Sequence, residues 1–130
     1  MKIQRTHVTT YDEEIPATLA QFMGWEFSSG PTTEMDFRVF ARLLRKHIQK
    51  VLPDGVQLEK FNAGHYYISG FLGKGGRYAY FSTSDVRHIP GQWHRNILIR
   101  TAKTTSDYTG ESNGYTSLAN FSQNVERLLN

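Results

Sequence analysis

The chain has 130 residues, a formal net charge of +3, and 38% hydrophobic and 21% charged side chains. This length suffices for one domain, residues 1–130, with a sizeable core, and this composition excludes a wholly disordered chain. The absence of cysteine excludes disulfides, zinc–thiolate sites and cysteine nucleophiles.

The charges are unevenly distributed along the sequence. Residues 1–36 carry two basic and six acidic side chains, residues 37–103 carry twelve basic and three acidic, and residues 104–130 carry one basic and three acidic. A basic centre of this kind attracts anions, nucleic acid or an acidic protein surface. No apolar run approaches the roughly 20 residues of a membrane helix, and no signal-peptide core is present, so we expect a cytoplasmic protein without a membrane partner.

The first third of the chain predicts an edge strand and two helices. Residues 1–10 are rich in β-branched side chains, which favour a strand. Ile15, Leu19, Phe22 and Met23 share one helical face, so a short helix is expected over residues 15–23.

A longer helix is predicted from Thr33, as the N-cap, to Leu52, where Pro53 ends it. Two stripes at helical spacing support it. The apolar stripe comprises Phe37, Phe40, Ala41, Leu44, Ile48 and Val51, and the opposite stripe comprises Arg38, Arg42, Arg45 and Gln49.

Four strands and a last helix follow. Strands are predicted over residues 56–61, 65–72, 77–83 and 96–103. The intervening turns are expected at Asn62-Ala63-Gly64 and at Gly73-Lys74-Gly75-Gly76, and Leu58 and Lys60 are expected on one side of the first strand. Residues 104–115 read as a long surface loop. The last helix is amphipathic, with Leu118, Phe121, Val125 and Leu128 on its apolar face.

This order predicts an α+β domain. An antiparallel sheet of about four strands would be covered by the preceding amphipathic helix and by the C-terminal helix. Large residues on both faces of the central strands indicate either a sheet covered on both sides or a face used for binding.

The motifs that could indicate nucleotide binding or catalysis lack the sequence context that such sites require. The glycine turn at 73–76 lies between strands, whereas a phosphate-binding loop joins a strand to a helix, so we expect no nucleotide cofactor there. Asp85, His88 and His94 offer oxygen and imidazole ligands for a metal-dependent hydrolase or nuclease. No HExxH pattern or second acidic cluster accompanies them, so this reading is the alternative and no bound metal is predicted.

Basic and aromatic residues of the central region predict a binding surface without catalysis. Guanidinium and ammonium groups neutralise phosphates, and aromatic rings stack on unpaired bases. Tyr78 and Tyr80 are interleaved with these cations, and the helix stripe Arg38, Arg42 and Arg45 is a secondary candidate. The principal candidates are Arg77, Arg87, His88, Trp93, Arg95, Arg100, Lys103 and Tyr108.

The segments YFSTSDVRH at 80–88, NILIRTAK at 96–103 and DYTG at 107–110 resemble small uncharacterised proteins carried by bacterial plasmids, conjugative elements and phages. The resemblance covers roughly residues 65–110 and implies no catalytic residues. It implies a protein that binds host machinery, including one that inhibits a CRISPR-type defence nuclease.

Two versions of a binding function follow. The chain either engages nucleic acid directly or inhibits a nucleic-acid-binding protein. In the second version the acidic residues Asp12, Glu13, Glu14 and Glu26 mimic phosphates. An accessory subunit with an aromatic protein interface is a further alternative.

Overall fold

The computed structural model describes residues 16–20, 22, 33–64, 66–83, 86, 93–106 and 113–130. The predicted strand at residues 1–10 therefore lies outside the described residues. Within the predicted helix at 15–23, helix α1 covers Ala17–Ala20. Leu19 and Phe22 are buried there, as their apolar spacing predicts.

Helix α2, Thr33–Val51, confirms the predicted long helix. Its apolar stripe is buried from Phe37 to Ile48, and the arginine stripe is exposed. Thr33 is its first residue and not the residue before it, a difference within the usual uncertainty of helix ends. No helix within the described ranges combines the length and the apolarity that a membrane crossing requires.

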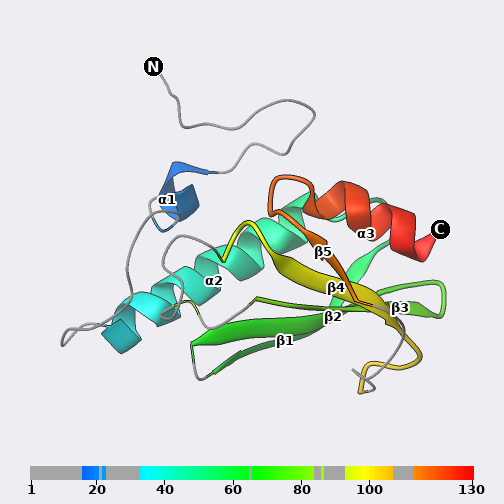
Figure 1. Cartoon of the computed structure of the whole chain (residues 1–130), viewed down its shortest axis with the longest axis horizontal. Coiled ribbons are helices and arrows are strands. Elements are labelled where there is room, and N and C mark those ends of the chain that lie inside the picture. Colours follow the sequence, from blue (N-terminus) through cyan, green and yellow to red (C-terminus); the bar gives the residue numbers. More distant parts are fainter. Residues whose placement is uncertain are drawn as a thin grey trace.

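The sheet has five antiparallel strands in the order β1-β2-β3-β4-β5 (Figure 1). They are β1 Gln57–Gly64, β2 Tyr67–Lys74, β3 Arg77–Ser82, β4 Ile97–Ala102 and β5 Gly114–Thr116. The α+β class is confirmed, with one strand more than predicted. Strand β5 lies at the end of the predicted loop and pairs with Ile97–Ile99 of β4. Three residues are too few to produce a period-two pattern, which is why the sequence does not reveal this strand.

The turns on either side of β2 differ from prediction. Strand β1 continues through Asn62 and Ala63 to Gly64, which pairs with Tyr67, so the expected turn at 62–64 is wrong. The chain reverses after Gly64, and Tyr66 has a left-handed backbone with φ of 66°. The second turn is confined to Gly75 and Gly76, whose positive φ angles suit a tight hairpin.

A bulge in β1 changes which side chains share a face. The register shifts between Leu58 and Lys60, so Leu58 pairs with Leu72 and Lys60 pairs with Phe71. Leu58 therefore faces the core while Lys60 faces the opposite side, and the prediction that they share a side is wrong. The extra residue of a bulge has no sequence signature in a strand of this length.

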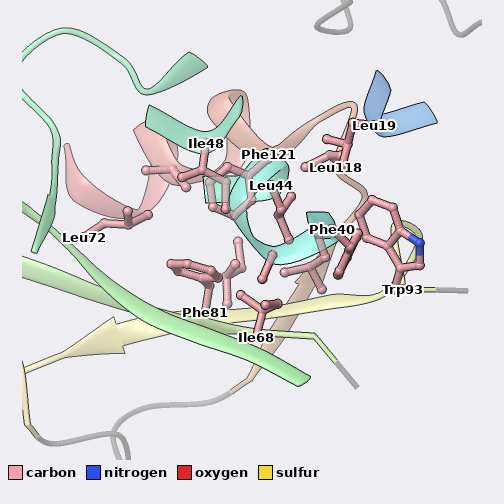
Figure 2. Close-up of a cluster of buried hydrophobic side chains, with 14 of the residues drawn as sticks. Leu19, Phe40, Leu44, Ile48, Ile68, Leu72, Phe81, Trp93, Leu118 and Phe121 are labelled. Carbon is pink, nitrogen blue, oxygen red and sulfur yellow. The ribbon is translucent and has the colours of Figure 1, made fainter. Parts of the chain in front are cut away.

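The core lies between the sheet and the helices α2 and α3, the latter spanning Phe121–Leu129. Figure 2 shows Ile68, Leu72 and Phe81 of the sheet pointing toward α2 and Phe121. The Phe81 and Phe121 rings meet edge to face at 5.5 Å. In α3 the buried positions are Phe121, Val125 and Leu129, so Leu129 replaces the predicted Leu128, which is half-buried.

The helices of the described chain lie on one side of the sheet (Figure 1). Alternate strand residues point to the other side, as the strand register places them. We call this other side the open face. The residues that the strand register places on it include Lys60, Asn62, Tyr67, Ser69, Phe71, Tyr78, Tyr80, Ser82, Leu98, Arg100 and Tyr115.

Gly70 lies on the core side of β2, where the lack of a side chain allows close packing against Phe81. A Cβ at Gly70 would collide with the Lys60 carbonyl oxygen and would lie 2.8 Å from the Phe81 ring. We expect Gly70→Ala to lower the free energy of unfolding by about 1–3 kcal/mol, the usual cost of overpacking, in a denaturant titration. Gly64→Ala is the matched control, because nothing lies within 4 Å of the added Cβ. Equal stabilities of the two variants would contradict this account.

His47 is a buried polar side chain of α2. It is 3% exposed, and neither ring nitrogen has a hydrogen-bond partner within the described chain. Burial lowers the pKa of His47 below 6.5, and the nearby charge of Lys50 lowers it further. The folded protein therefore holds this imidazole neutral at pH values where the unfolded chain protonates it.

This difference predicts a pH-dependent loss of stability. Above pH 6.5 the imidazole is neutral in both states, and below it only the unfolded state takes up the proton until the lowered folded pKa is reached. In that window we expect the free energy of unfolding of the unmodified protein to fall by up to about 1.4 kcal/mol for each unit that the pH is lowered. We expect the His47→Leu protein not to show this fall. Denaturant titrations of both proteins between pH 8 and pH 5 measure this effect, and a stability difference that stays constant with pH would contradict it.

Candidate nucleic-acid interface

Four side chains, one from each of four neighbouring strands, form a row across the open face, with a cation at each end. Lys60 of β1 pairs with Phe71 of β2, Phe71 pairs with Tyr80 of β3, and Tyr80 pairs with Arg100 of β4. Directly paired residues share a face, so register alone aligns these groups across four strands. The row places two aromatic rings between two positive charges.

Contacts within the row hold Tyr80 and Arg100 together. The Phe71 and Tyr80 ring centroids are 5.2 Å apart, and the Arg100 guanidinium carbon lies 5.1 Å from the Tyr80 centroid. Arg100 Nη1 also donates to Asn113 Oδ1 at 2.7 Å, while its Nε is buried without a hydrogen-bond partner among the described residues. No described carboxylate forms an ion pair with this guanidinium. A cation over a ring face is an attractive pairing in its own right.

Exposed tyrosines flank this row. Tyr115 of β5 is 62% exposed and pairs with Leu98, and Tyr67 at the start of β2 is 40% exposed. Each ring presents an apolar body and a hydroxyl to solvent. These two tyrosines supply flat surfaces for stacking, and the row supplies cations nearby, as an unpaired base and its phosphate require. The ring of Phe71 is 5% exposed and is not itself a stacking surface.

Gly73 allows the close packing at one end of the open face. A side chain there would lie 2.9 Å from Glu59 Oε2 and 3.1 Å from the Tyr78 ring. The bulge residue Glu59 thus brings an acid to the rim of this face, away from the pair formed by Tyr80 and Arg100.

Trp93, one of the predicted stacking residues, belongs to the core. Its indole is 1% exposed, packs 4.7 Å from the Phe40 centroid, and donates from Nε1 to the Phe22 carbonyl at 2.9 Å. It cannot stack on a base, so its prediction as a binding residue is corrected. Residues that precede a strand give no periodic signal, and the sequence therefore does not reveal that this loop position is buried.

The predicted basic residues are divided among several places. Arg77 and Lys103 line a cleft of about 420 Å³ at the end of the sheet beside Leu129. Arg77 Nη1 donates to the Leu129 carbonyl at 3.3 Å, which satisfies the C-terminus of α3. Arg95 is exposed at the opposite end of β4 from Lys103. Among these predicted cations, Arg100 lies on the open face.

The remaining candidates are partly outside the described residues. Arg87, His88 and Tyr108 fall there, as does Asp85 of the alternative metal site. His94 is half-buried, with its ring 5.4 Å from that of Trp93. The described residues hold no group of three potential metal ligands. The convergence of Asp85, His88 and His94 therefore stays a prediction.

The helix stripe lies apart from the open face. Arg38, Arg42 and Arg45 are exposed on α2, which packs on the other side of the sheet. Arg38 pairs with Glu34 at 2.9 Å, and Arg45 lies 5.6 Å from the Phe61 ring centroid.

Lys60, Phe71 and Tyr115 are members of the open face that sequence reasoning missed. Their alternation with core residues marks the face, but their alignment depends on the bulge and on the hairpin register. Comparisons of the chain with protein families, with curated proteins and with solved structures find no match.

Proposed function

We propose that this protein is a non-catalytic, single-stranded nucleic-acid-binding protein that uses the open face of its sheet. The observation that carries the proposal is the row Lys60–Phe71–Tyr80–Arg100, in which two rings lie between two cations on neighbouring strands, with the exposed rings of Tyr67 and Tyr115 beside it. Neighbouring strands are about 4.8 Å apart, so the two cations stand about 14 Å from each other.

The shape of the face favours a single strand over a duplex. A sheet surface is broad and shallow, whereas readers of a duplex groove insert a helix or a ribbon. Bases of a single strand are free to splay onto rings such as Tyr115 and Tyr67, which are exposed. Stacking of this kind tolerates any base, so we expect little sequence preference.

Charge supports the same function. Arg100 and Lys60 both lie on the face and can neutralise phosphates there. The inhibitor version of the function draws on Asp12, Glu13, Glu14 and Glu26, which lie outside the described residues, and it stays an alternative. The resemblance to proteins of mobile elements is compatible with either version.

Tyr115→Ala tests stacking. Loss of one stacked base costs about 1–3 kcal/mol, so we expect the affinity for a fluorescein-labelled 12-nucleotide single strand to fall roughly 5- to 150-fold in an anisotropy titration. Met35→Ala on α2 is the matched control, since Met35 is 66% exposed on the helix layer. Equal affinities of the two variants, or no binding of DNA or RNA by the unmodified protein, would sink the proposal.

Arg100→Gln tests the phosphate contact. Each neutralised phosphate of a single strand contributes about −0.7 to the slope of log affinity against log salt concentration, so we expect the slope to become shallower by about that amount. Arg45→Gln is the control, because Arg45 also lies over an aromatic ring but on α2. A shallower slope for Arg45→Gln, with no change for Arg100→Gln, would move the site to the helix.

A further inference from the structure

A cleft of about 550 Å³ lies on the helix side of the sheet, between α2 and the end of β1. Phe37 and Ala41 of α2 supply apolar wall, and Ala63 and Gly64 supply the strand side. This volume lies in the range of sites that enclose a side chain or a small ligand. The cleft is on the opposite side of β1 from the open face, so it goes beyond the proposed function.

Strand β1 is the edge of the sheet, and no other described strand pairs with its outer side. Its first half is protected by the bulge and by the charges of Glu59 and Lys60. Its second half, Phe61–Gly64, has neither charge nor proline. An edge without these devices offers its backbone N–H and C=O groups to another strand.

Apolar side chains remain partly uncovered along this edge. Ala63 pairs with the core residue Ile68 and therefore faces the helices, yet it is exposed in the cleft. Phe61 pairs with Gly70 on the same side and is half-buried. A strand added beside β1 would cover both residues.

Tyr66 forms the end wall of the cleft in an unusual conformation. Among the described residues other than glycine, Tyr66 alone has a positive φ, 66°. The centroid of its ring lies 5.2 Å from that of Phe37. The Val86 N–H donates to the Tyr66 carbonyl at 2.9 Å and helps to hold the backbone. Backbone strain of this kind persists where the surroundings enforce it, and it clusters at binding sites.

The positive charge of α2 beside the cleft favours an acidic partner. The exposed side of α2 carries Arg42, Arg45 and Lys46 in addition to Arg38, which lines the cleft. Glu34 is the acid at the rim and already pairs with Arg38 at 2.9 Å. Both members of that pair are mostly exposed, and exposed pairs are weak, so a partner carboxylate can compete for Arg38.

We propose that the groove between α2 and β1 binds an extended acidic peptide of a partner protein as an additional strand along Phe61–Gly64. An apolar side chain of the peptide enters the cleft beside Phe37 and Ala63. Acidic side chains two residues away on the same side of the peptide approach Arg45.

The test uses a fluorescein-labelled eight-residue peptide in which threonine alternates with glutamate, one glutamate being replaced by leucine. Alternate residues of a strand direct their N–H groups to opposite sides, so two N-methylated peptides are compared, one methylated at the threonines and one at the other residues. We expect one methylation pattern to weaken binding at least about tenfold and the other to leave it within about threefold. Equal effects of both patterns, or no binding of the unmethylated peptide, would overturn the proposal.

Two protein variants locate the site. Ala63→Glu places a bulky acid in the cleft, and Asn62→Glu makes the same charge change on the neighbouring residue, which faces the other side. We expect Ala63→Glu to weaken peptide binding at least about tenfold and Asn62→Glu to change it within about threefold. Similar losses for both would mean that charge alone directs the peptide, and would overturn strand addition.

Other occupants give distinct results. An oligonucleotide that displaces the peptide from a protein carrying both Tyr115→Ala and Lys60→Gln, whose open face has lost a stacking ring and the cation on β1, would assign the groove to nucleic acid. A dimer of this chain that Ala63→Glu dissociates in sedimentation would assign the edge to a second copy. Either result overturns the proposal, and neither depends on whether the open face binds nucleic acid.

Discussion

The close contact of Phe81 with Gly70 is the constraint on which the two sides of the sheet depend. The ring fits over Gly70 because no Cβ is present, and the same ring packs edge to face with Phe121 of α3. This packing is compatible with one register of β2 against β3, since a shift by one residue would turn Phe81 away from the core. With Phe81 fixed inward, alternation places Tyr80 on the open face, and pairing with β4 brings Arg100 beside it.

The bulge in β1 is the second constraint. It lets Leu58 and Phe61 both face the helices although they are three residues apart, and it directs Lys60 to the open face opposite Phe71. The same irregularity protects the first half of the edge, because a bulge and charged side chains hinder pairing with another chain. One extra residue thus completes the cationic end of the row and confines the accessible edge to Phe61–Gly64.

The sequence predicts the elements whose signals are local. The apolar stripe of α2 continues over several turns, and the strands around the glycine hairpin carry enough alternation to be recognised. Features that depend on contacts distant in sequence could not be predicted. Trp93 is buried because its indole packs against Phe40 and donates a hydrogen bond to the Phe22 carbonyl. Lys60 lies on the open face because of the register between β1 and β2. The sequence does allow Tyr80 and Arg100 to be predicted on the face opposite the core, because both residues alternate with core positions of their strands.

The two proposed sites share β1, so binding at one affects the other. A strand added at the edge lies about 4.8 Å from β1, which is within the roughly 8 Å over which charges act at physiological salt. Carboxylates of an acidic peptide therefore reduce the positive potential at Lys60. Arg100 stands three strands further away, at about 19 Å from the added strand, where salt screens the effect. The peptide should weaken nucleic-acid binding through Lys60 alone, and by reciprocity nucleic acid should weaken peptide binding by the same factor.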